Sequence, residues 1–435
     1  MDPLMDLSRY PLEAIAQRIG TPFFLYDAGI LRARMAEVAR TAAPDGTRDR
    51  LHARYAMKAN SNRFVLDAAR EAGLWIDAVS GNEVGRALRA GFASGHEPPV
   101  IMYTADVFRD NALATVVEHD ILPNVGSPGM VRELHEAGYA GPIAIRVNPG
   151  FGHGHVQACD TGGPSSKHGI WIDDIAEVHA AAKQAGYPVV ALHAHVGTGP
   201  QIAEFDQNMR RLVDVFDALL QQFPDATSVN LGGGIPHAYR LDAQRYDLRG
   251  FRTLMLEASS TLSESAGRPI ALEIEPGRYP VAGMAILVGR VTDVKDTRSN
   301  EKGPGQRFVM VDAGFNDLIR PAMYGSYHHI SVVAPDVEAR ATEFVNVAGP
   351  LCESGDVFTR DEDELLLPRE LPSPQPGDLV VLHDAGAYGY AMSSNYVSMG
   401  RAPQIAWDDG AVTLVSRRET LDDVLRAETS EVLAV

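Results

Sequence analysis

Short apolar runs alternate with longer amphipathic stretches from about residue 50 to residue 280. The longer stretches repeat their apolar positions with a helical period, and several end at glycine, a residue that commonly terminates helices. Strands that alternate with helices in this way indicate βα units and a parallel sheet. The eight apolar runs are LHARYAMKA, LWIDAVS, PVIMYT, ILPNVGS, PIAIRVN, VVALHAHVG, SVNLGG and IALEIEPG. They predict a (β/α)₈ TIM barrel, in which the segment GILRARMAEVART before the first strand completes the ring of helices.

The pattern changes after the last of these runs. Strand-like segments then follow one another with turn residues between them, which is typical of an antiparallel β domain of the sandwich or barrel type. They are AILVGRVTDV, QRFVMVDAG, EFVNVAG, DLVVLHDAG, PQIAW and VTLVSRR, and the polar segment RDEDELLLPRELPSPQPGD is expected to be an exposed connection. The predicted fold class is therefore α/β plus β. We expect an N-terminal segment over 1–26 that packs on the β domain, the barrel over 27–283 and the β domain over 284–435.

Composition narrows the possible partners. The chain has 435 residues, which is more than one hydrophobic core usually serves, and a formal net charge of -18 disfavours nucleic acids and anionic membrane surfaces as partners. No apolar run approaches the roughly 18 residues that span a bilayer, and the N-terminus lacks the basic start of a signal peptide, so we expect a cytoplasmic location. The cysteines, Cys159 and Cys352, form no CxxC pair and suggest neither a disulfide framework nor a zinc site.

Lys58 is notable because lysine is rare in this chain, where arginine supplies nearly all the other positive charge. A lone lysine at a barrel rim more often extends into solvent than reacts. In a TIM barrel, however, catalytic groups come from the carboxyl ends of strands. The predicted strand ends also hold Asp77, Ser80, His195, Gly197, Thr198, Gly232, Gly233, Gly234, Glu275 and Arg278. A lysine desolvated among such groups loses its proton more easily and can form a Schiff base with a carbonyl.

Two glycine turns at the ends of the seventh and eighth predicted strands suit a phosphate group. LGGGIP offers backbone amides without obstructing side chains, and EPGR adds the Gly277 amide and Arg278, while Thr198 can contribute a hydroxyl. Phosphate sites of this fold recur in those two loops. A reactive lysine beside a phosphate site indicates pyridoxal phosphate, whose pyridine nitrogen needs a carboxylate partner, here Glu275. In this interpretation His195 stacks on the pyridine ring and His193 only packs.

A metal-dependent hydrolase is the main rival from another class. His193 and His195 lie two apart in a predicted strand, so they point to the same side, and GHGH at 152–155 and YHH at 327–329 add further imidazoles. The two glycine turns would then have no role, so we predict no metal site.

The second half of the chain carries weaker signals. Cys352 would more often be a buried small residue, and Arg320 a surface charge. Each nevertheless follows or precedes a predicted strand end beside glycine, as do Tyr324, Glu353 and Tyr388. Two arginines, Arg278 and Arg320, together with the carboxylate of Glu353 would suit a ligand that has carboxylate and ammonium groups at its far end.

Six motifs taken together resemble those of the fold type III, alanine-racemase-like pyridoxal-phosphate decarboxylases, and within them the chain is similar to the diaminopimelate decarboxylases. The motifs are YAMKANSN, HVGTG, GGG, EPGR, CESGD and DAGAYG, and the resemblance covers essentially the whole chain. It implies decarboxylation of meso-2,6-diaminopimelate at its D-centre to L-lysine and carbon dioxide, the last step of lysine biosynthesis. It also implies a homodimer in which Cys352 and Glu353 act in the partner's site.

The resemblance assigns a role to individual residues. Lys58 should form the Schiff base, His195 should stack on the cofactor ring, and Cys352 should return a proton after carbon dioxide leaves. The cofactor-binding set implied is Lys58, Asp77, His195, Thr198, Gly233, Gly234, Glu275, Gly277, Arg278 and Tyr388. The substrate-binding set is Arg278, Arg320, Tyr324, Glu353 and Tyr388.

Two positions depart from the pattern of the family. Thr198 stands where many relatives have serine, which keeps the hydroxyl. Val397 stands where relatives commonly have asparagine, and the following arginine comes later, at Arg401. This leaves open a sister decarboxylase that acts on another diamino acid or diamino dicarboxylate. A pyridoxal-phosphate carrier without catalysis is a further alternative, but such proteins are usually a lone barrel.

Overall fold

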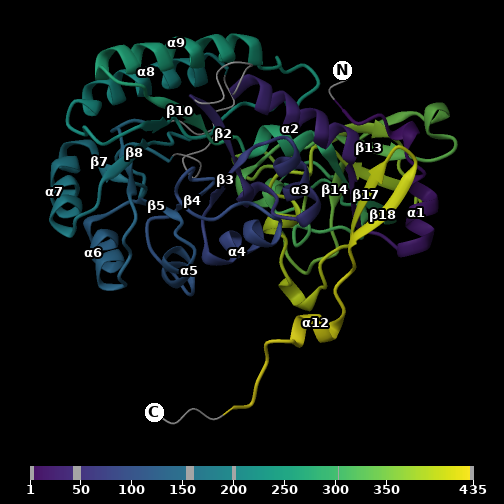
Figure 1. Cartoon of the computed structure of the whole chain (residues 1–435). Helices are drawn as coiled ribbons and strands as arrows, with labels where there is room; N and C mark the ends of the chain where they lie inside the picture. The colour runs from purple at the N-terminus through teal and green to yellow at the C-terminus, as the bar shows by residue number, and fades with distance from the viewer. Residues whose placement is uncertain (1–3, 43–49, 153–160, 198–201, 302, 432–435) are drawn as a thin grey trace. The chain divides into compact units, whose positions relative to one another are not determined.

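The computed structural model describes residues 4–42, 50–152, 161–197, 202–301 and 303–431. The chain forms two compact units (Figure 1). Unit 1 comprises Met1–Ile30, Tyr239–Ala243 and Val281–Val435, and unit 2 comprises Leu31–Ala238 and Gln244–Pro280. Each unit is therefore built from segments that are separate in the sequence.

Unit 2 is a closed parallel barrel, which confirms the predicted fold. Its eight strands are β2 (Leu51–Ala56), β3 (Trp75–Ala78), β4 (Ile101–Thr104), β5 (Leu122–Val125), β6 (Ile143–Asn148), β8 (Val189–His193), β9 (Ser228–Asn230) and β10 (Ala271–Ile274). The strand order is β5-β4-β3-β2-β10-β9-β8-β6, and the pairing of β5 with β6 closes the barrel. The two-residue strand β7 (Ile170–Trp171) adds to β6. Each of the eight predicted apolar runs supplies one barrel strand.

Helices surround these strands in Figure 1. They are α2 (Ala28–Ala42), α3 (Arg63–Glu71), α4 (Gly81–Arg89), α5 (Ala112–Glu118), α6 (Pro128–Glu136), α7 (Ile175–Ala185), α8 (Ile202–Leu220), α9 (Leu248–Ala266) and the short α10 (Arg278–Val281). Their ends follow capping rules: the Ser80 side chain accepts a hydrogen bond from the Glu83 amide, and Gly186 and Gly267 end α7 and α9 in the left-handed conformation. Ser80, singled out as a strand-end residue, is thus the N-cap of α4.

Unit 1 contains a nine-stranded sheet. Its strands are β1 (Phe23–Asp27), β11 (Ala285–Asp296), β12 (Arg307–Val311), β13 (Ile330–Val333), β14 (Thr342–Ala348), β15 (Arg369–Pro372), β16 (Leu379–Leu382), β17 (Gln404–Asp408) and β18 (Ala411–Ser416). The order is β15-β14-β12-β11-β1-β17-β18, and β16 pairs with β11 and β13. The helices are α1 (Leu12–Ile19), α11 (Arg320–Tyr324) and α12 (Leu421–Leu425). Short 3₁₀ turns lie at η1 (Leu7–Arg9), η2 (Met57–Ala59), η4 (Ile172–Asp174), η5 (Ala282–Met284), η6 (Val337–Ala339), η7 (Tyr390–Met392) and η8 (Tyr396–Ser398).

The expectation of an antiparallel sheet was wrong in part, because two of its strand pairs are parallel. Strand β1 runs parallel to β17, and β12 runs parallel to β14. Parallel neighbours need long connections, and both pairs have them: most of the chain separates β1 from β17, and α11 and β13 lie between β12 and β14. The sheet is therefore mixed.

The segment expected to be a polar connection was also partly misjudged. Its residues Arg369–Pro372 form β15, an edge strand that pairs with β14. The strand sequence RELP contains no β-branched residue and ends in proline, which is tolerated at sheet edges. The sequence signal for a strand was therefore weak.

The core of unit 1 joins the two ends of the chain. Phe23 and Leu25 of β1 pack with Ile286 and Val288 of β11 and with Ile15 of α1.

In the part of the chain that the structure describes, no helix combines the length and the apolar character needed to cross a membrane.

Candidate active site

Titratable side chains gather at the carboxyl ends of the barrel strands. Lys58 lies in η2 directly after β2, Asp77 lies in β3, His195 follows β8, and Glu275 follows β10. The charge of Lys58 contributes to the pKa values of Asp77, His195 and Glu275, so its ammonium group reaches all three electrostatically. The side chain of Lys58 is exposed, and the expected desolvation was wrong. Its neighbours in the same 3₁₀ turn, Met57 and Ala59, are buried, so the exposure is confined to the Lys58 side chain.

Glu275 is a buried carboxylate held by two neighbours. His193 Nε2 donates to its Oε2 at 3.0 Å, and Asn230 Nδ2 donates to its Oε1 at 2.8 Å. Burial alone would raise the pKa of Glu275, but the charge and the hydrogen bond of His193, together with the charge of Lys58, lower it to about 2. Glu275 is therefore ionised at neutral pH. The prediction that His193 only packs was wrong, because this side chain orients Glu275.

Asp77 behaves in the opposite way. Burial and then the negative charge of Glu275 raise the pKa of Asp77 to about 7, against smaller lowering effects of Lys58 and of a hydrogen bond from Thr104. Among the described residues, no group forms a hydrogen bond with its buried Oδ1 atom. A buried polar atom without a partner is costly and commonly marks a ligand site.

His195 is neutral in this environment. Burial, and then the positive charges of Lys58 and Arg146, lower the pKa of His195 well below its ordinary value. The amide of Gly233 donates to Nδ1 of His195 at 3.3 Å, so the ring proton is on Nε2. A neutral imidazole fixed by the backbone is suited to contact an aromatic ring without adding charge.

The glycines after β9 allow a close approach of the loop to the neighbouring strand ends. A Cβ atom on Gly233 would lie 2.4 Å from the carbonyl oxygen of Glu275, and one on Gly232 would lie 2.6 Å from that of Ala194. The Gly232 amide donates to Asn230 Oδ1 at 2.8 Å, so this amide, like that of Gly233, already has a partner within the protein. Gly234 has a φ of 114°, which side chains rarely tolerate.

Two further predicted residues belong to this loop cluster. A Cβ atom on Gly277 would lie 3.1 Å from Ala56, so the EPGR turn also packs closely on β2. Arg278 is half-buried and begins α10. Thr198 lies outside the described residues.

Sequence reasoning missed the support beneath Glu275. Arg54 is fully buried, and its Nε donates to Glu273 Oε2 at 2.6 Å, while its guanidinium lies 4.7 Å from the ring centroid of Trp75. Asn230 Nδ2 lies 3.3 Å from the same Glu273 oxygen. Contacts thus run from Arg54 through Glu273 and Asn230 to Glu275, across the adjacent strands β2, β10 and β9. Charged residues in the middle of predicted buried strands were the available signal.

The remaining predicted site residues belong to unit 1. Arg320 is buried, so its interpretation as a surface charge is excluded; it donates to His328 Nε2 at 2.9 Å and to Ser326 Oγ at 3.2 Å. His328 Nδ1 lies 2.8 Å from the carbonyl oxygen of His383 and must donate to it, so Nε2 is the acceptor for Arg320. Tyr324 ends α11, one turn after Arg320, and is half-buried.

The CESGD loop presents two exposed side chains on a buried anchor. Cys352 has a free, exposed thiol, and Glu353 is exposed as well. Asp356 of the same loop is buried and accepts hydrogen bonds from the amides of Phe315 at 2.7 Å and Leu351 at 2.8 Å. The alternative of a buried Cys352 is therefore wrong, and Asp356 is a structural residue that the sequence reasoning did not separate from the motif.

Two residues of unit 1 have unusual backbone conformations. Tyr388 has a φ of 60° and Val397 a φ of 51°, in the left-handed region that non-glycine residues rarely adopt. Such conformations often occur at functional sites, and a β-branched residue such as valine is strained there. Tyr388 is half-buried, whereas Val397 is exposed.

The histidine motifs that suggested a metal have other partners. His193 binds Glu275, and His328 binds Arg320. Within the described ranges, no group of three His, Cys, Asp or Glu residues is arranged to hold a metal ion. His153 and His155 of the GHGH motif lie outside those ranges.

Comparison with known proteins identifies the family of the chain. Residues 31–282 match the family model of the pyridoxal-dependent decarboxylase pyridoxal-binding domain. Diaminopimelate decarboxylase of Escherichia coli strain K12 is 39% identical over 97% of both chains, and that of Streptomyces coelicolor is 40% identical over 96% of this chain and 91% of its own.

Solved structures give the same result. A crystal structure of diaminopimelate decarboxylase matches with a TM-score of 0.86 and 39% identity over 95% of both chains. Diaminopimelate decarboxylase from Helicobacter pylori, complexed with L-lysine, matches with a TM-score of 0.81 and 27% identity over 95% of this chain and 98% of its own. The chain therefore belongs to the diaminopimelate decarboxylase family of pyridoxal-dependent decarboxylases.

Proposed function

We propose that this protein uses pyridoxal phosphate to decarboxylate meso-2,6-diaminopimelate at its D-centre, which yields L-lysine and carbon dioxide. The observation that carries the proposal is the buried Glu275, kept ionised by His193 and Asn230 within electrostatic reach of Lys58. Membership of the family, over nearly the full length of the chain, supports the choice of substrate.

The carboxyl-terminal end of the barrel, called the barrel mouth below, fits the cofactor in two respects. The Asp77 Oδ1 atom is buried without a partner in the described structure, and Lys58 extends an exposed amine. Glycine at 234 and at 277 lets the two turns pack closely on neighbouring strand ends. When bound, pyridoxal phosphate supplies an electron sink for the pair left as the bond from Cα to the carboxylate breaks.

We assign a separate role toward the cofactor to each residue of the barrel mouth. Lys58 binds the cofactor aldehyde, and ionised Glu275 keeps the pyridine nitrogen protonated. Neutral His195 covers the ring, and the amides of Gly234 and Gly277, with the Thr198 hydroxyl, hold the phosphate. Asp77 adds a buried carboxyl group near the same ring.

Unit 1 supplies most of the residues that we propose for the substrate. Arg278 of the barrel, Arg320, Tyr324 and Glu353 grip the non-reacting L-end, and Tyr388 contacts cofactor and substrate. Cys352 returns a proton to Cα. We propose a homodimer in which Cys352 and Glu353 act in the partner's site, and the exposure of both side chains supports this arrangement.

The cofactor claim is tested by absorption spectroscopy of the purified protein after loading with pyridoxal phosphate. We expect a band from lysine-bound pyridoxal that disappears in Lys58→Ala. Lys183→Ala, on a helix of the barrel, is the control and should keep the band. An unchanged band in Lys58→Ala would refute the assignment.

Substrate identity is tested with a panel of meso-diaminopimelate, its LL-isomer, lysine, ornithine and arginine, with carbon dioxide and amine products measured. Lysine formed from the meso compound supports the proposal. Turnover of ornithine or arginine instead would identify a sister decarboxylase, for which the unusual Val397 is the motivating observation.

A further inference from the structure

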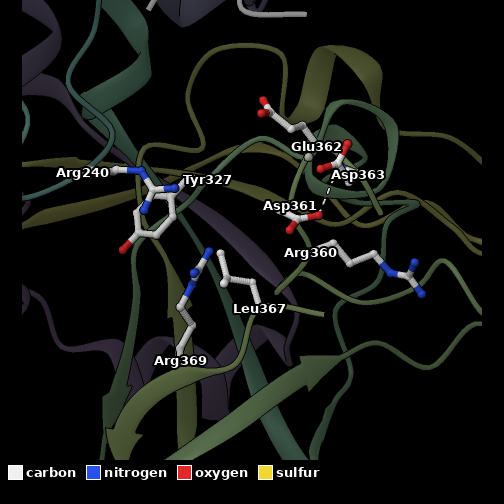
Figure 2. A pocket seen from close by; sticks show the side chains of 9 residues that line it. Arg240, Tyr327, Arg360, Asp361, Glu362, Asp363, Leu367 and Arg369 are labelled. Atoms are coloured by element: carbon white, nitrogen blue, oxygen red, sulfur yellow. Dashed lines mark hydrogen bonds between the residues drawn. The ribbon is translucent and has the colours of Figure 1, made fainter. Parts of the chain in front are cut away.

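Unit 1 contains a cavity of about 190 Å³ whose charged residues have no role in the proposed reaction. Figure 2 shows Arg240, Tyr327 and Arg369 on one side of it and Arg360 and Asp361 on the other. Arg240 belongs to the short segment Tyr239–Ala243, Tyr327 follows α11, and Arg369 begins β15. Three distant parts of the sequence therefore build one pocket within a single unit.

Two guanidinium groups stack on the same tyrosine ring. The Cζ atom of Arg240 lies 4.2 Å from the ring centroid of Tyr327, and that of Arg369 lies 4.3 Å from it. In the described structure neither guanidinium forms an ion pair, and the buried Nε of Arg369 has no hydrogen-bond partner. Burial, and then the nearby charge of Arg240, lower the pKa of Arg369, although the Tyr327 hydroxyl opposes this. The two guanidinium groups thus carry positive charge that forms no ion pair with a described carboxylate, although Asp361, Glu362 and Asp363 also line the pocket.

Arg360 and Asp361 of the pocket bind backbone groups nearby, although the buried Nε of Arg360 has no partner in the described structure. Arg360 donates from Nη1 to the Glu364 carbonyl at 2.8 Å and from Nη2 to the Ser354 carbonyl at 2.6 Å. Asp361 Oδ1 accepts from two amides of its own turn, at 3.1 Å and 2.9 Å. In Figure 2 Glu362 and Asp363 are drawn near Asp361, on the other side of the view from Tyr327. Arg240 and Arg369 are the arginines of the pocket whose terminal guanidinium nitrogens form no hydrogen bond in the described structure.

We propose that Arg240 and Arg369, stacked on Tyr327, form a binding site for an oxyanion, the carboxylate or phosphate group of a small ligand. Guanidinium groups match both oxyanions through paired, charge-assisted hydrogen bonds. Stacking on the tyrosine holds both groups in place before the ligand arrives, which lowers the entropic cost of binding. The site shares no residue with the set proposed for the decarboxylation, so it is an additional site.

The backbone of the pocket is firmly packed on the side of Asp361. A Cβ atom on Gly325 would lie 2.3 Å from the Glu362 amide nitrogen, so the turn lies directly against Gly325. The cavity wall is thus defined by packing of the protein itself. The volume admits a carboxylate or phosphate group together with water, since one water takes about 30 Å³ of liquid volume.

The test is calorimetric titration of the full-length protein, saturated with pyridoxal phosphate and dialysed, with inorganic phosphate and separately with succinate at low ionic strength. Saturation with the cofactor removes the catalytic phosphate site from the measurement. We expect one anion per chain, and about tenfold or greater weakening in Arg240→Met and in Arg369→Met, because each loses charge-assisted hydrogen bonds. Tighter binding of phosphate identifies a phosphate ligand, and tighter binding of succinate identifies a carboxylate.

A matched control removes the same charge elsewhere. Arg249→Met changes a highly exposed arginine of α9 and should leave anion binding unchanged. Thermal unfolding of each variant shows that it is folded. The proposal is overturned if neither anion binds, or if both pocket variants bind as the unaltered protein does. It is also overturned if the variants lose only dimerisation in sedimentation experiments, because the arginines would then contact a second copy. The titration does not depend on decarboxylase activity, so its failure is distinct from failure of the proposed function.

Discussion

The barrel mouth holds buried charges, whereas in the Arg240–Arg369 pocket Arg240 is exposed and Arg369 is half-buried. In the mouth, Glu275 is bound by His193 and Asn230, and Glu273 beneath it is bound by Arg54. In the pocket, Arg240 and Arg369 share only the ring of Tyr327. A charged side chain that is bound by other protein groups keeps its position without a ligand. A charged side chain without such a partner can still form hydrogen bonds with a ligand. The contrast therefore distinguishes structural residues of a site from residues that can bind a ligand.

The largest expected effect is on catalysis in Glu275→Gln. The amide cannot keep the pyridine nitrogen protonated, and we expect kcat to fall by about 10²- to 10³-fold, as for removal of other preorganised electrostatic groups. The measurement is carbon dioxide release from meso-diaminopimelate by cofactor-saturated protein. Glu257→Gln, which changes an exposed carboxylate of α9, should keep its activity. A loss of less than tenfold in Glu275→Gln would contradict the role of this carboxylate.

Next in size is the effect of Arg54→Met on stability. This change leaves Glu273 buried without its cation, and we expect the free energy of unfolding to fall by about 3–5 kcal/mol in urea titrations. Adding Glu273→Gln removes the unpaired charge and should restore part of the loss. If Arg54→Met unfolds like the unaltered protein, the buried pair is not a support of the mouth.

The effect of Arg369→Met on stability can be compared with that of Arg54→Met, because Arg369 stacks on the ring of Tyr327 but has no carboxylate partner. We expect it to cost at most about 1 kcal/mol, the magnitude of one cation–π contact. Arg63→Met, which breaks an exposed ion pair with Asp67, should change stability by about 0.5 kcal/mol or less. Equal losses in Arg54→Met and Arg369→Met would erase the proposed distinction between the two regions.

The fourth prediction concerns pH. The folded-state pKa of Asp77 is raised to about 7 from 3.8, so between these values the native protein holds a proton that the unfolded chain has lost. Its contribution to the free energy of unfolding therefore decreases as pH rises from about 4 to 7, by at most about 1.4 kcal/mol per pH unit. Glu275 acts in the opposite direction at lower pH, because its lowered pKa adds stability as pH rises from about 2 to 4.5.

The contribution of Asp77 is isolated by difference. Urea unfolding of the unaltered protein and of Asp77→Asn, across pH 4 to 7, should show a stability difference that shifts in favour of Asp77→Asn as pH rises. A constant difference over this range would mean that Asp77 titrates normally in the folded protein.

A modest effect of the opposite sign, a gain in stability, is expected in Val397→Asn. Asparagine tolerates the left-handed backbone that Val397 adopts, and the side chain is 51% exposed, so the change should raise the free energy of unfolding by about 1 kcal/mol. Val412→Asn, at an exposed site in the extended strand β18, is the matched control and should not stabilise. A loss of stability in Val397→Asn would mean that valine makes contacts that outweigh its backbone strain.

Periodicity made the barrel predictable and the second sheet only partly so. Each barrel strand is a compact apolar run bounded by helices, so its type could be inferred locally. Strand β1, by contrast, pairs with β11 and β17, which lie far away in the sequence, and no local signal specifies those partners. Strand β15 lacked both alternation and β-branched residues.

For the candidate site as well, some features could be predicted from local sequence and others could not. The rule that functional groups follow barrel strands was enough to single out Lys58, Asp77, His195 and Glu275 from their positions in the sequence. It could not show that His193 and Asn230 hold Glu275, because those contacts depend on the order of strands around the barrel. Nor could it show that Lys58 is exposed between the buried residues Met57 and Ala59, since this depends on which side chain of the 3₁₀ turn faces outward.

The most direct test of the central claim is a stereochemical one. Protein saturated with pyridoxal phosphate is incubated with meso-diaminopimelate and, separately, with the LL-isomer, and carbon dioxide and chiral lysine are measured together. We predict equal amounts of carbon dioxide and L-lysine from the meso compound and no reaction of the LL-isomer. Absence of lysine from the meso compound, or lysine formed equally from both isomers, would contradict the proposed function.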